Sequence, residues 1–309
     1  MNTTGHQNTT ILPRYGFSMA PAIPRMQLCG RYTVIESNRA QIELWDGRVG
    51  EKWAAMQISL DAILSHATAE LKARAGSVLG RRVLDIGCGA EETCVIWLDA
   101  GAAVTGVDVS GPLLAVAADR TDGQVTLVKA DAAVWMGDAP FDLAVSQFGL
   151  MFFADPDAAF ATITASVRPD GRLLFTCWRT AAENQWVTTP MAAMRDLLTP
   201  SSPSVPNAPG PFALADRDRL RGIVERAGFT EVAIDPFDFP VCLSNEGGVE
   251  AAVRLAMQIG PSGSALVGAS KATLALAQER LKAALVPHDK DGLVTLGGAI
   301  WLIDAVRPV

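Results

Sequence analysis

An apolar segment that ends in two closely spaced glycines constrains the fold of this chain most. It covers residues 82–89 and has the sequence RVLDIGCG. The apolar residues around Asp85 predict a buried strand, Gly87 and Gly89 predict a tight turn, and a helical pattern follows over residues 91–100. A strand, a glycine-rich turn and a helix together form a site where a ligand contacts exposed backbone at a helix N-terminus.

A second predicted strand, VTGVD over residues 104–108, ends in a carboxylate nineteen residues after Gly89. An acid at this position is placed to accept hydrogen bonds from the two hydroxyls of a ribose. A dinucleotide fingerprint, G-x-G-x-x-G, needs a third glycine where this chain has Glu92, and acids at Glu91 and Glu92 oppose bound phosphates. The pattern therefore indicates a nucleoside-containing ligand without a pyrophosphate.

These residues resemble the first motif of the class I S-adenosylmethionine-dependent methyltransferases, D-x-G-x-G-x-G. Asp85, Gly87 and Gly89 match it, and Glu91 replaces the usual third glycine. The resemblance implies that S-adenosyl-L-methionine is the cofactor. It implies that Asp85, Gly87, Cys88 and Gly89 lie under the methionine part of the cofactor. It also implies that Asp108 and Val109 bind the ribose. The alternative is an ordinary strand–helix turn whose glycines serve packing alone.

The third predicted strand ends at Asp131. The resemblance to the methyltransferases implies that Asp131 accepts a hydrogen bond from the amino group of the cofactor's adenine. It also implies that the backbone of Ala132 contacts a nitrogen of the adenine ring. An aspartate that caps a short helix over residues 131–135 is the alternative, and the two roles are compatible.

A second motif, FDLAVSQFGLMFF over residues 141–153, resembles the fourth-strand motif of a small-molecule group related to the quinone C-methyltransferases. By this resemblance the carbonyl of Ser146 holds the methionine ammonium group, Phe148 contacts the cofactor and Met151 lines the acceptor chamber. The two phenylalanines that end the motif could equally be core residues. The likeness covers most of residues 83–186.

Four tryptophans are candidates for the same site. Trp45 and Trp53 precede the sheet, and aromatic faces there favour a sulfonium cation, although a packing stripe is the common alternative. Trp178 and Trp186 flank a late insertion and are predicted to bind the acceptor.

No nucleophile–base arrangement is visible, so no catalytic residue is assigned. Because a sulfonium methyl group is already activated, its transfer chiefly needs proximity and alignment. If the acceptor must lose a proton, the candidates for a general base are Tyr32, Glu36, His66 and His288.

Composition excludes several classes of protein. The chain has 309 residues, is 49% hydrophobic and carries a net charge of −7 with scattered basic residues, which argues against a nucleic-acid partner. Five cysteines without a C-x-x-C pair and three histidines argue against a metal site. No apolar run is long enough for a membrane span, and the first ten residues do not resemble a secretory signal, so we expect a cytoplasmic protein, monomeric or homodimeric.

Strand and helix patterns alternate along the chain and predict an α/β fold: a Rossmann-like, seven-stranded, mostly parallel sheet with helices on both faces. We expect an irregular arm over residues 1–36, a helical leader or lid over 37–80 that Gly47 and Gly50 interrupt, and a class I methyltransferase domain over 81–309. Lid insertions are expected at about 180–213 and 244–292, and the last strand over 299–305.

The sequence thus predicts methyl transfer to a small, apolar or aromatic metabolite through oxygen, nitrogen or carbon. Two rivals stay open: an enzyme of the same fold that uses the bound cofactor for a rearrangement, elimination or decarboxylation, and a non-catalytic homologue. Fold alone does not distinguish the three.

Overall fold

The structure is a computed structural model that describes residues 38–90, 92–198, 205–244 and 246–309. The expected arm over 1–36, which includes the candidate bases Tyr32 and Glu36, lies outside the described residues. So does Glu91, the residue at the usual third glycine.

The described residues form one mixed sheet with the strand order β3-β2-β1-β4-β5-β8-β6, and a short β7 pairs with β8. Five neighbouring strands, β3, β2, β1, β4 and β5, are mutually parallel. Strand β8 is antiparallel to both β5 and β6. The predicted mostly parallel sheet is confirmed, but it has eight strands instead of seven because the two-residue β7 pairs with β8. The strands are β1 (Arg82–Ile86), β2 (Ala103–Asp108), β3 (Thr126–Lys129), β4 (Phe141–Gln147), β5 (Val167–Trp178), β6 (Thr230–Ser244), β7 (Asp289–Lys290) and β8 (Leu293–Val306).

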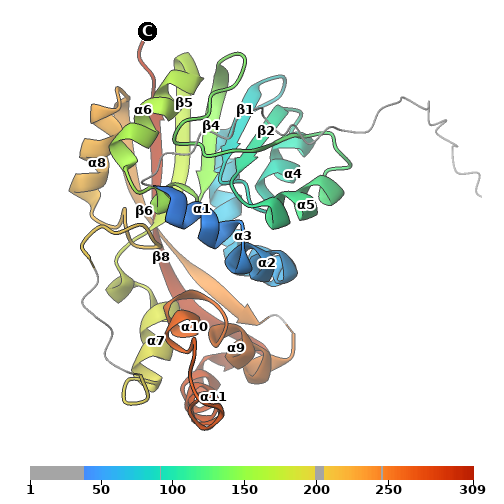
Figure 1. The fold of residues 1–309 in the computed structure, drawn as a ribbon, viewed down its shortest axis with the longest axis vertical. Coiled ribbons are helices and arrows are strands. Elements are labelled where there is room, and N and C mark those ends of the chain that lie inside the picture. Colours follow the sequence, from blue (N-terminus) through green and yellow to red (C-terminus); the bar gives the residue numbers. More distant parts are fainter. Residues whose placement is uncertain (1–37, 91, 199–204, 245) are drawn as a thin grey trace, which may run out of the picture.

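Helices cover both faces of the sheet (Figure 1). Helices α3, α4 and α5 pack on one face, and α6 and α8 pack together on the other. The expected helix over 131–135 is wrong: the backbone there forms only a turn closed by bonds to the Asp131 carbonyl. The helices are α1 (Arg39–Trp45), α2 (Arg48–Ala55), α3 (Gln57–Ala75), α4 (Glu92–Asp99), α5 (Gly111–Arg120), α6 (Pro156–Ser166), α7 (Gln185–Ala193), α8 (Arg217–Arg226), α9 (Gly248–Ala256), α10 (Gly260–Ala265) and α11 (Lys271–Leu285).

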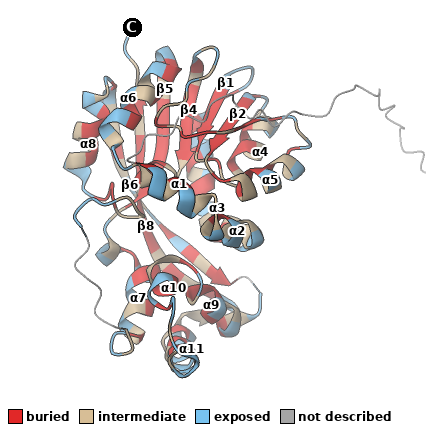
Figure 2. Ribbon diagram, in the orientation of Figure 1, coloured by how far each residue is buried: buried red, intermediate tan, exposed pale blue. Residues whose placement is uncertain are grey.

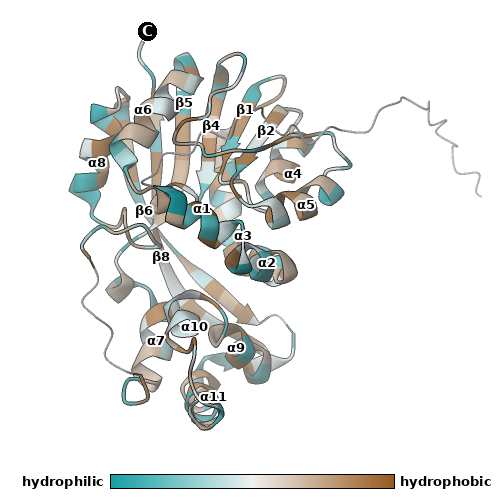
Figure 3. Ribbon diagram, in the orientation of Figure 1, coloured by the Kyte–Doolittle hydropathy of each residue, from teal (hydrophilic) through white to brown (hydrophobic). Residues whose placement is uncertain are grey.

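The central strands are buried on both faces, as parallel strands between two helical layers must be (Figure 2). Successive side chains along a strand point to opposite faces of the sheet and so pack against different helical layers. On β1, Val83 belongs to the cluster under α4, with Trp97, whereas Leu84 and Ile86 belong to the cluster on the other face, with Phe160 of α6. The hydrophilic residues lie outward, most visibly on α8 (Figure 3).

The helical leader consists of α1, α2 and α3 (Figure 1). The turn between α1 and α2 lies at the end of the sheet where β2 and β3 finish, whereas α3 packs on β5 and β6. The expected break at Gly47 is present, but Gly50 lies inside α2, and the second break falls at Met56. The glycine at 50 serves a close approach instead. A Cβ atom there would lie 2.0 Å from the Trp45 carbonyl oxygen and 2.4 Å from the Ser110 hydroxyl.

Strands β6 and β8 continue past the parallel strands as a two-stranded ribbon, and this extension explains why β8 begins at Leu293 rather than at the expected residue 299. Helix α9 packs on both strands of the ribbon and α7 on β8, and α11 packs on α7 and α9. We call these helices, together with α10, the lower lobe (Figure 1). The lower lobe is built from the segments that the sequence predicts as insertions.

Candidate active site

One large cavity lies where the leader, the carboxyl ends of the central strands and the lower lobe meet. The space inside it, counted together with the part that is open to solvent, is about 1310 Å³. The cavity has two differently built ends. We call the end that contains Asp108 and Asp131 the carboxylate end, and the end that contains Phe148, Trp178 and Trp186 the aromatic end.

The turn after β1 forms the floor of the carboxylate end. Gly87 and Gly89 both have φ of +64°, a conformation that side chains other than hydrogen disfavour. A Cβ atom on Gly87 would lie 2.9 Å from the Cα of Gly149, whereas one on Gly89 would contact nothing within 4 Å. Gly87 is therefore required for close packing of two backbones, and Gly89 leaves bare backbone toward the cavity.

Asp108 ends β2 and holds the turn in shape. Its two carboxylate oxygens accept hydrogen bonds from the backbone N–H of Gly89, at 2.9 Å, and of Ser110, at 2.8 Å. Burial raises the pKa of Asp108, and these backbone donors act against that rise. Because a carboxylate has about four acceptor sites, it can still accept from hydroxyl groups in the cavity.

Asp131, at the end of β3, is nearly completely buried. Its Oδ1 accepts hydrogen bonds from the backbone N–H of Ala133 and from the side-chain amide of Asn38, both at 3.0 Å. Its Oδ2 accepts no hydrogen bond from any residue that the structure describes. A buried carboxylate oxygen without a donor is unusual in a folded protein, and this oxygen can accept a hydrogen bond from a ligand or a water molecule.

The leader is attached over the carboxylate end by polar contacts. Asp46, just after α1, pairs with Lys129 of β3 at 2.7 Å and accepts from the backbone N–H of Gly111 at 2.8 Å. On α2, the Lys52 ammonium group donates to the carbonyl of Gln258 in the lower lobe. The leader and the lower lobe therefore meet across the cavity.

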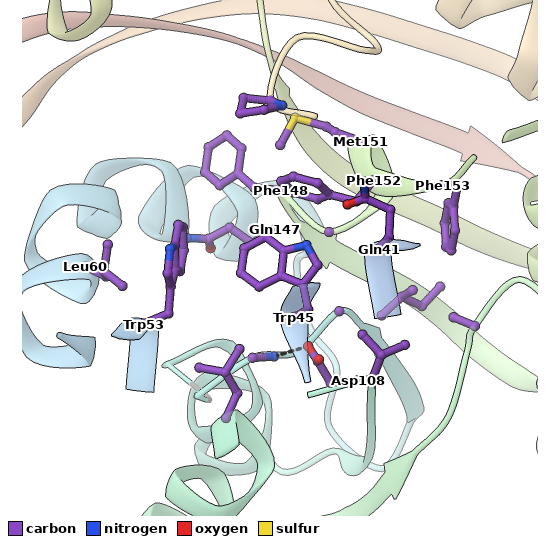
Figure 4. A pocket seen from close by; sticks show the side chains of 18 of the residues that line it. Gln41, Trp45, Trp53, Leu60, Asp108, Gln147, Phe148, Met151, Phe152 and Phe153 are labelled. Atoms are coloured by element: carbon purple, nitrogen blue, oxygen red, sulfur yellow. Dashed lines mark hydrogen bonds between the residues drawn. The ribbon is translucent and has the colours of Figure 1, made fainter. Parts of the chain in front are cut away.

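Two leader tryptophans project into the cavity (Figure 4). Trp45 packs edge-on against Trp53, with ring centroids 5.3 Å apart, and against Phe152 at 5.0 Å. The faces of these rings are apolar and electron-rich, and such faces attract a cation.

The aromatic end is a stack of rings from distant parts of the chain. Phe148 stacks on Trp178 with centroids 4.6 Å apart and an interplanar angle of 17°. Trp178 also contacts Trp186 at 4.9 Å and Phe239 of the ribbon at 6.0 Å. Phe148 has φ of +60°, which is strained for a bulky residue, and strain of this kind concentrates at functional sites.

Two carboxamides face the space between the two ends (Figure 4). The amide nitrogen of Gln147 donates to the Thr68 hydroxyl at 3.0 Å, so its oxygen is directed elsewhere. Neither this oxygen nor that of Gln41 has a hydrogen-bond partner among the described residues, and both are buried. Each can accept a hydrogen bond from a ligand.

The structure brings most of the sequence-predicted residues together at this one cavity. Twelve line it: Trp45, Trp53, Gly87, Gly89, Asp108, Val109, Asp131, Ala132, Phe148, Met151, Trp178 and Trp186. The side chains of Asp85, Cys88 and Ser146 are not among the lining residues. Ser146 is fully buried, and its hydroxyl donates to the Ile86 carbonyl at 2.7 Å.

Asp85 departs most from its expected place. Its side chain lies on the face of β1 that α4 covers, where the Cys94 thiol donates to it at 3.6 Å. Burial raises the pKa of Asp85 to about 7, and contacts with Thr93, Cys94 and Trp97 only partly oppose this. Cys88 belongs to the same buried cluster. Both side chains support the turn from beneath.

Sequence analysis missed several lining residues. Gln147 follows the quoted Ser146 directly and could have been named from that motif. Asn38 and Gln41 belong to the leader, where nothing local distinguishes them from surface helix residues. Ile259 and Gly260 reach the cavity only because the lower lobe folds back to it.

Three further properties of the described residues concern metal binding, membrane crossing and the candidate base His66. No group of three or more histidine, cysteine or acidic side chains in that part of the chain could hold a metal ion. None of its helices combines the length and the apolar character that a membrane crossing needs. His66, a candidate base, stacks on Phe239 at 6.4 Å and does not line the cavity.

Known proteins give an independent view of this site. Residues 84–175 match a family described as "Methyltransferase domain". The malonyl-[acyl-carrier protein] O-methyltransferase of Pseudescherichia vulneris is 35% identical over 124 residues, which are 40% of this chain and 49% of that protein. The ubiquinone biosynthesis O-methyltransferase of Aromatoleum aromaticum is 33% identical over 109 residues, 33% of this chain and 46% of that protein. The chain thus spans about half the length of these curated relatives.

Among solved structures, phosphoethanolamine N-methyltransferase 2 of Haemonchus contortus, in complex with S-adenosyl-L-methionine, shares the fold with a TM-score of 0.53. The alignment covers 89% of this chain and 61% of that chain at 18% identity.

The match identifies a methyltransferase domain over residues 84–175, and this part of the chain is similar to the quinone methyltransferases. The cofactor of such domains is S-adenosylmethionine, which the Haemonchus contortus enzyme of similar fold binds. The carboxylate end fits that cofactor, because it offers bare backbone at Gly89, a carboxylate for a ribose at Asp108 and an unpaired buried acceptor on Asp131.

Proposed function

We propose that this protein transfers the methyl group of S-adenosylmethionine to a small, uncharged, apolar or aromatic acceptor that occupies the aromatic end. One observation carries the proposal. The described residues that line the cavity include no lysine, arginine or histidine, and their only charged side chains are Asp108 and Asp131 at the other end.

This charge distribution selects against anionic acceptors. A phosphate or carboxylate that leaves water needs a cation or several donors to replace its hydration. The names of the malonyl and phosphoethanolamine enzymes imply acceptors with such groups, and the aromatic end has no counter-charge for them. Stacked rings at Phe148, Trp178 and Trp186 instead favour a flat, apolar acceptor.

The chain's contribution to the reaction is positioning. The bound cofactor supplies an activated methyl group. The carboxylate end holds its nucleoside, with Asp108 at the ribose and Asp131 and Ala132 at the adenine. The aromatic end holds the acceptor in line with the methyl group, an arrangement that replaces a bimolecular encounter by an intramolecular one. The Gln147 oxygen accepts from a hydroxyl or amine on the acceptor and orients it.

We further propose that the leader and the lower lobe act as the lid of this site. Both line the cavity, through Trp45 and Trp53 on one side and Trp186 and Gly260 on the other. The hydrogen bond from Lys52 to the Gln258 carbonyl joins the leader to the lower lobe across the carboxyl ends of the strands. A lid of this kind excludes water, which prevents competing hydrolysis.

The test begins with calorimetric titration of the protein with S-adenosylmethionine and S-adenosylhomocysteine. It continues with a panel of neutral phenols, quinols and amines, and with carboxylate and phosphate analogues of the same rings. The expected result is stoichiometric S-adenosylhomocysteine and methylated product with neutral acceptors only. Conversion of an acceptor without S-adenosylhomocysteine would show a cofactor-retaining enzyme, and preference for the ionised analogues would overturn the charge argument.

A further inference from the structure

Asn38 occupies a position where an asparagine usually has a different role. It is the residue before α1, where asparagine side chains normally accept a hydrogen bond from the first turn of the helix. Here the side chain makes no capping bond. It is 6% exposed, lines the cavity and donates its amide to Asp131 at 3.0 Å.

The contact with Asp131 determines which way the amide points. An ionised carboxylate only accepts hydrogen bonds, so the nitrogen of Asn38 must face Asp131 and the oxygen must face away from it. That oxygen, Oδ1, is buried and accepts no hydrogen bond from the described residues. The neighbouring Oδ2 of Asp131 is in the same condition.

Asn38 and Asp131 are hydrogen-bonded to each other and line the same cavity, and each has one buried acceptor without a donor among the described residues. Each such group is unfavourable unless a ligand supplies the missing hydrogen. An exocyclic amino group carries two hydrogens on one nitrogen, and it satisfies both acceptors at once. A keto group at the same place would direct its lone pairs at two acceptors and satisfy neither.

We propose that Asn38 and Asp131 together form a two-acceptor site for the 6-amino group of the cofactor's adenine, so that a residue of the leader selects adenosyl over inosyl ligands. The proposal rests on S-adenosylmethionine as cofactor and is independent of the acceptor. It also links the leader to the cofactor, because the amino group bridges α1 and the end of β3.

The experiment compares two ligands that differ at this one position. Affinities of S-adenosylhomocysteine and S-inosylhomocysteine are measured by calorimetry with the full chain, without any acceptor. We expect the wild-type protein to prefer the adenosyl ligand by at least about 100-fold, because a site built to bind an amino group rejects an analogue without it. Asn38→Ala should reduce this preference about tenfold, chiefly by weakening adenosyl binding.

A matched variant separates recognition from simple attachment of the leader. Lys129→Met removes the ion pair with Asp46 but leaves Asn38 and Asp131 intact. It should weaken both ligands by the same factor and leave the preference unchanged. Circular dichroism and thermal melting confirm that each variant is folded.

Other results would overturn the proposal. If Asn38→Ala weakens both ligands equally, as Lys129→Met does, Asn38 only attaches the leader. If the wild-type protein binds both ligands alike, the amino group is not read at all. If it binds neither, the cofactor assignment fails as well, and that outcome is distinct from the first two.

Discussion

The two ends of the cavity are built in opposite ways. The carboxylate end comes mainly from one stretch, residues 86–132, in which most lining residues lie at the end of a parallel strand or directly after it. The aromatic end combines residues 147–153 with Trp178, Trp186 and the lower lobe near Gly260. The first end uses backbone and acids in fixed turns, and the second uses apolar rings from segments far apart in sequence.

The difference separates a common task from a particular one. A nucleoside presents the same hydroxyls and amino group whatever the acceptor is, so a rigid turn after each strand suits it. An acceptor is recognised by shape and by the absence of charge, and these depend on how the lower lobe meets the sheet. Changes at the carboxylate end should therefore affect cofactor binding, and changes at the aromatic end should affect the acceptor alone.

Gly87→Ala should have the largest effect. The residue has φ of +64°, and its Cβ would lie 2.9 Å from the Cα of Gly149, where no flexible side chain can move away. Left-handed strain and backbone overlap together predict a loss of about 3–5 kcal/mol in the free energy of unfolding. Gly89→Ala has the same φ and no overlap, so it should lose only about 1–2 kcal/mol. Chemical denaturation measures both, and equal losses would refute the packing argument.

Asp85→Asn tests whether this acid belongs to the cofactor site or to the core beneath it. Its pKa of about 7 in the folded protein lies above the ordinary 3.8, so the folded state holds the proton more tightly than the unfolded chain does. The stability that the protonated form contributes is present below about pH 4 and is lost as the pH rises to about 7, a loss of roughly 4 kcal/mol. The asparagine variant should lack this pH dependence, measured by denaturation between pH 4 and 8.

Cofactor affinity provides the second readout for the same variant. Because the Asp85 carboxylate faces α4, S-adenosylhomocysteine should bind Asp85→Asn with affinity close to that of the wild-type protein. A tenfold loss of affinity at constant stability would return Asp85 to the floor of the carboxylate end.

The same contrast explains what the sequence could predict. The strands β1 to β4 have local signals, and all four were predicted to within a residue of their observed ends. Side chains alternate along a strand, so Asp85 must lie on the same face of β1 as Val83. The sequence does not reveal which of the two faces meets the ligand, because that depends on the topology of the sheet. The sequence therefore predicts the backbone turn, whereas the direction of the Asp85 side chain follows only from the topology.

Errors occurred where long-range contacts decide the structure. The expected helix over 131–135 is too short to be stable alone, and the Asp131 carboxylate accepts from Ala133 instead to close a turn. The first half of β8 contains Gly297 and Gly298, which suggest a loop. A Cβ on Gly298 would lie 2.5 Å from Cγ2 of Val241 on β6, so the glycine serves close strand packing that no local pattern reveals.

Asp108→Ala should have a moderate effect that is confined to the carboxylate end. Removing the carboxylate deletes its acceptors for the ribose and leaves the N–H groups of Gly89 and Ser110 unpaired. We expect a loss of about 1–3 kcal/mol in the free energy of S-adenosylhomocysteine binding, measured by calorimetry. Glu183→Ala, on the surface beside Arg179, serves as a control that should bind normally. Unchanged affinity in Asp108→Ala would refute the ribose assignment.

Gly260→Ala should have the smallest effect, and one that is confined to the aromatic end. Gly260 has φ of +59°, and a Cβ atom there would lie 2.5 Å from Cζ3 of Trp186, whose indole nitrogen donates to Asn184 at 3.1 Å. The ring must therefore shift, so the KM for the acceptor should rise while S-adenosylhomocysteine affinity stays within about twofold and stability falls by about 1–2 kcal/mol.

Gly268→Ala is the matched control, since Gly268 has φ of +79° and open space around it. It should lose similar stability without a change in KM, because its backbone strain is not transmitted to a ring in the cavity. If Gly260→Ala instead weakened cofactor and acceptor together, the two ends would be one coupled site. The division between a nucleoside cradle and a separately shaped acceptor chamber would then be wrong.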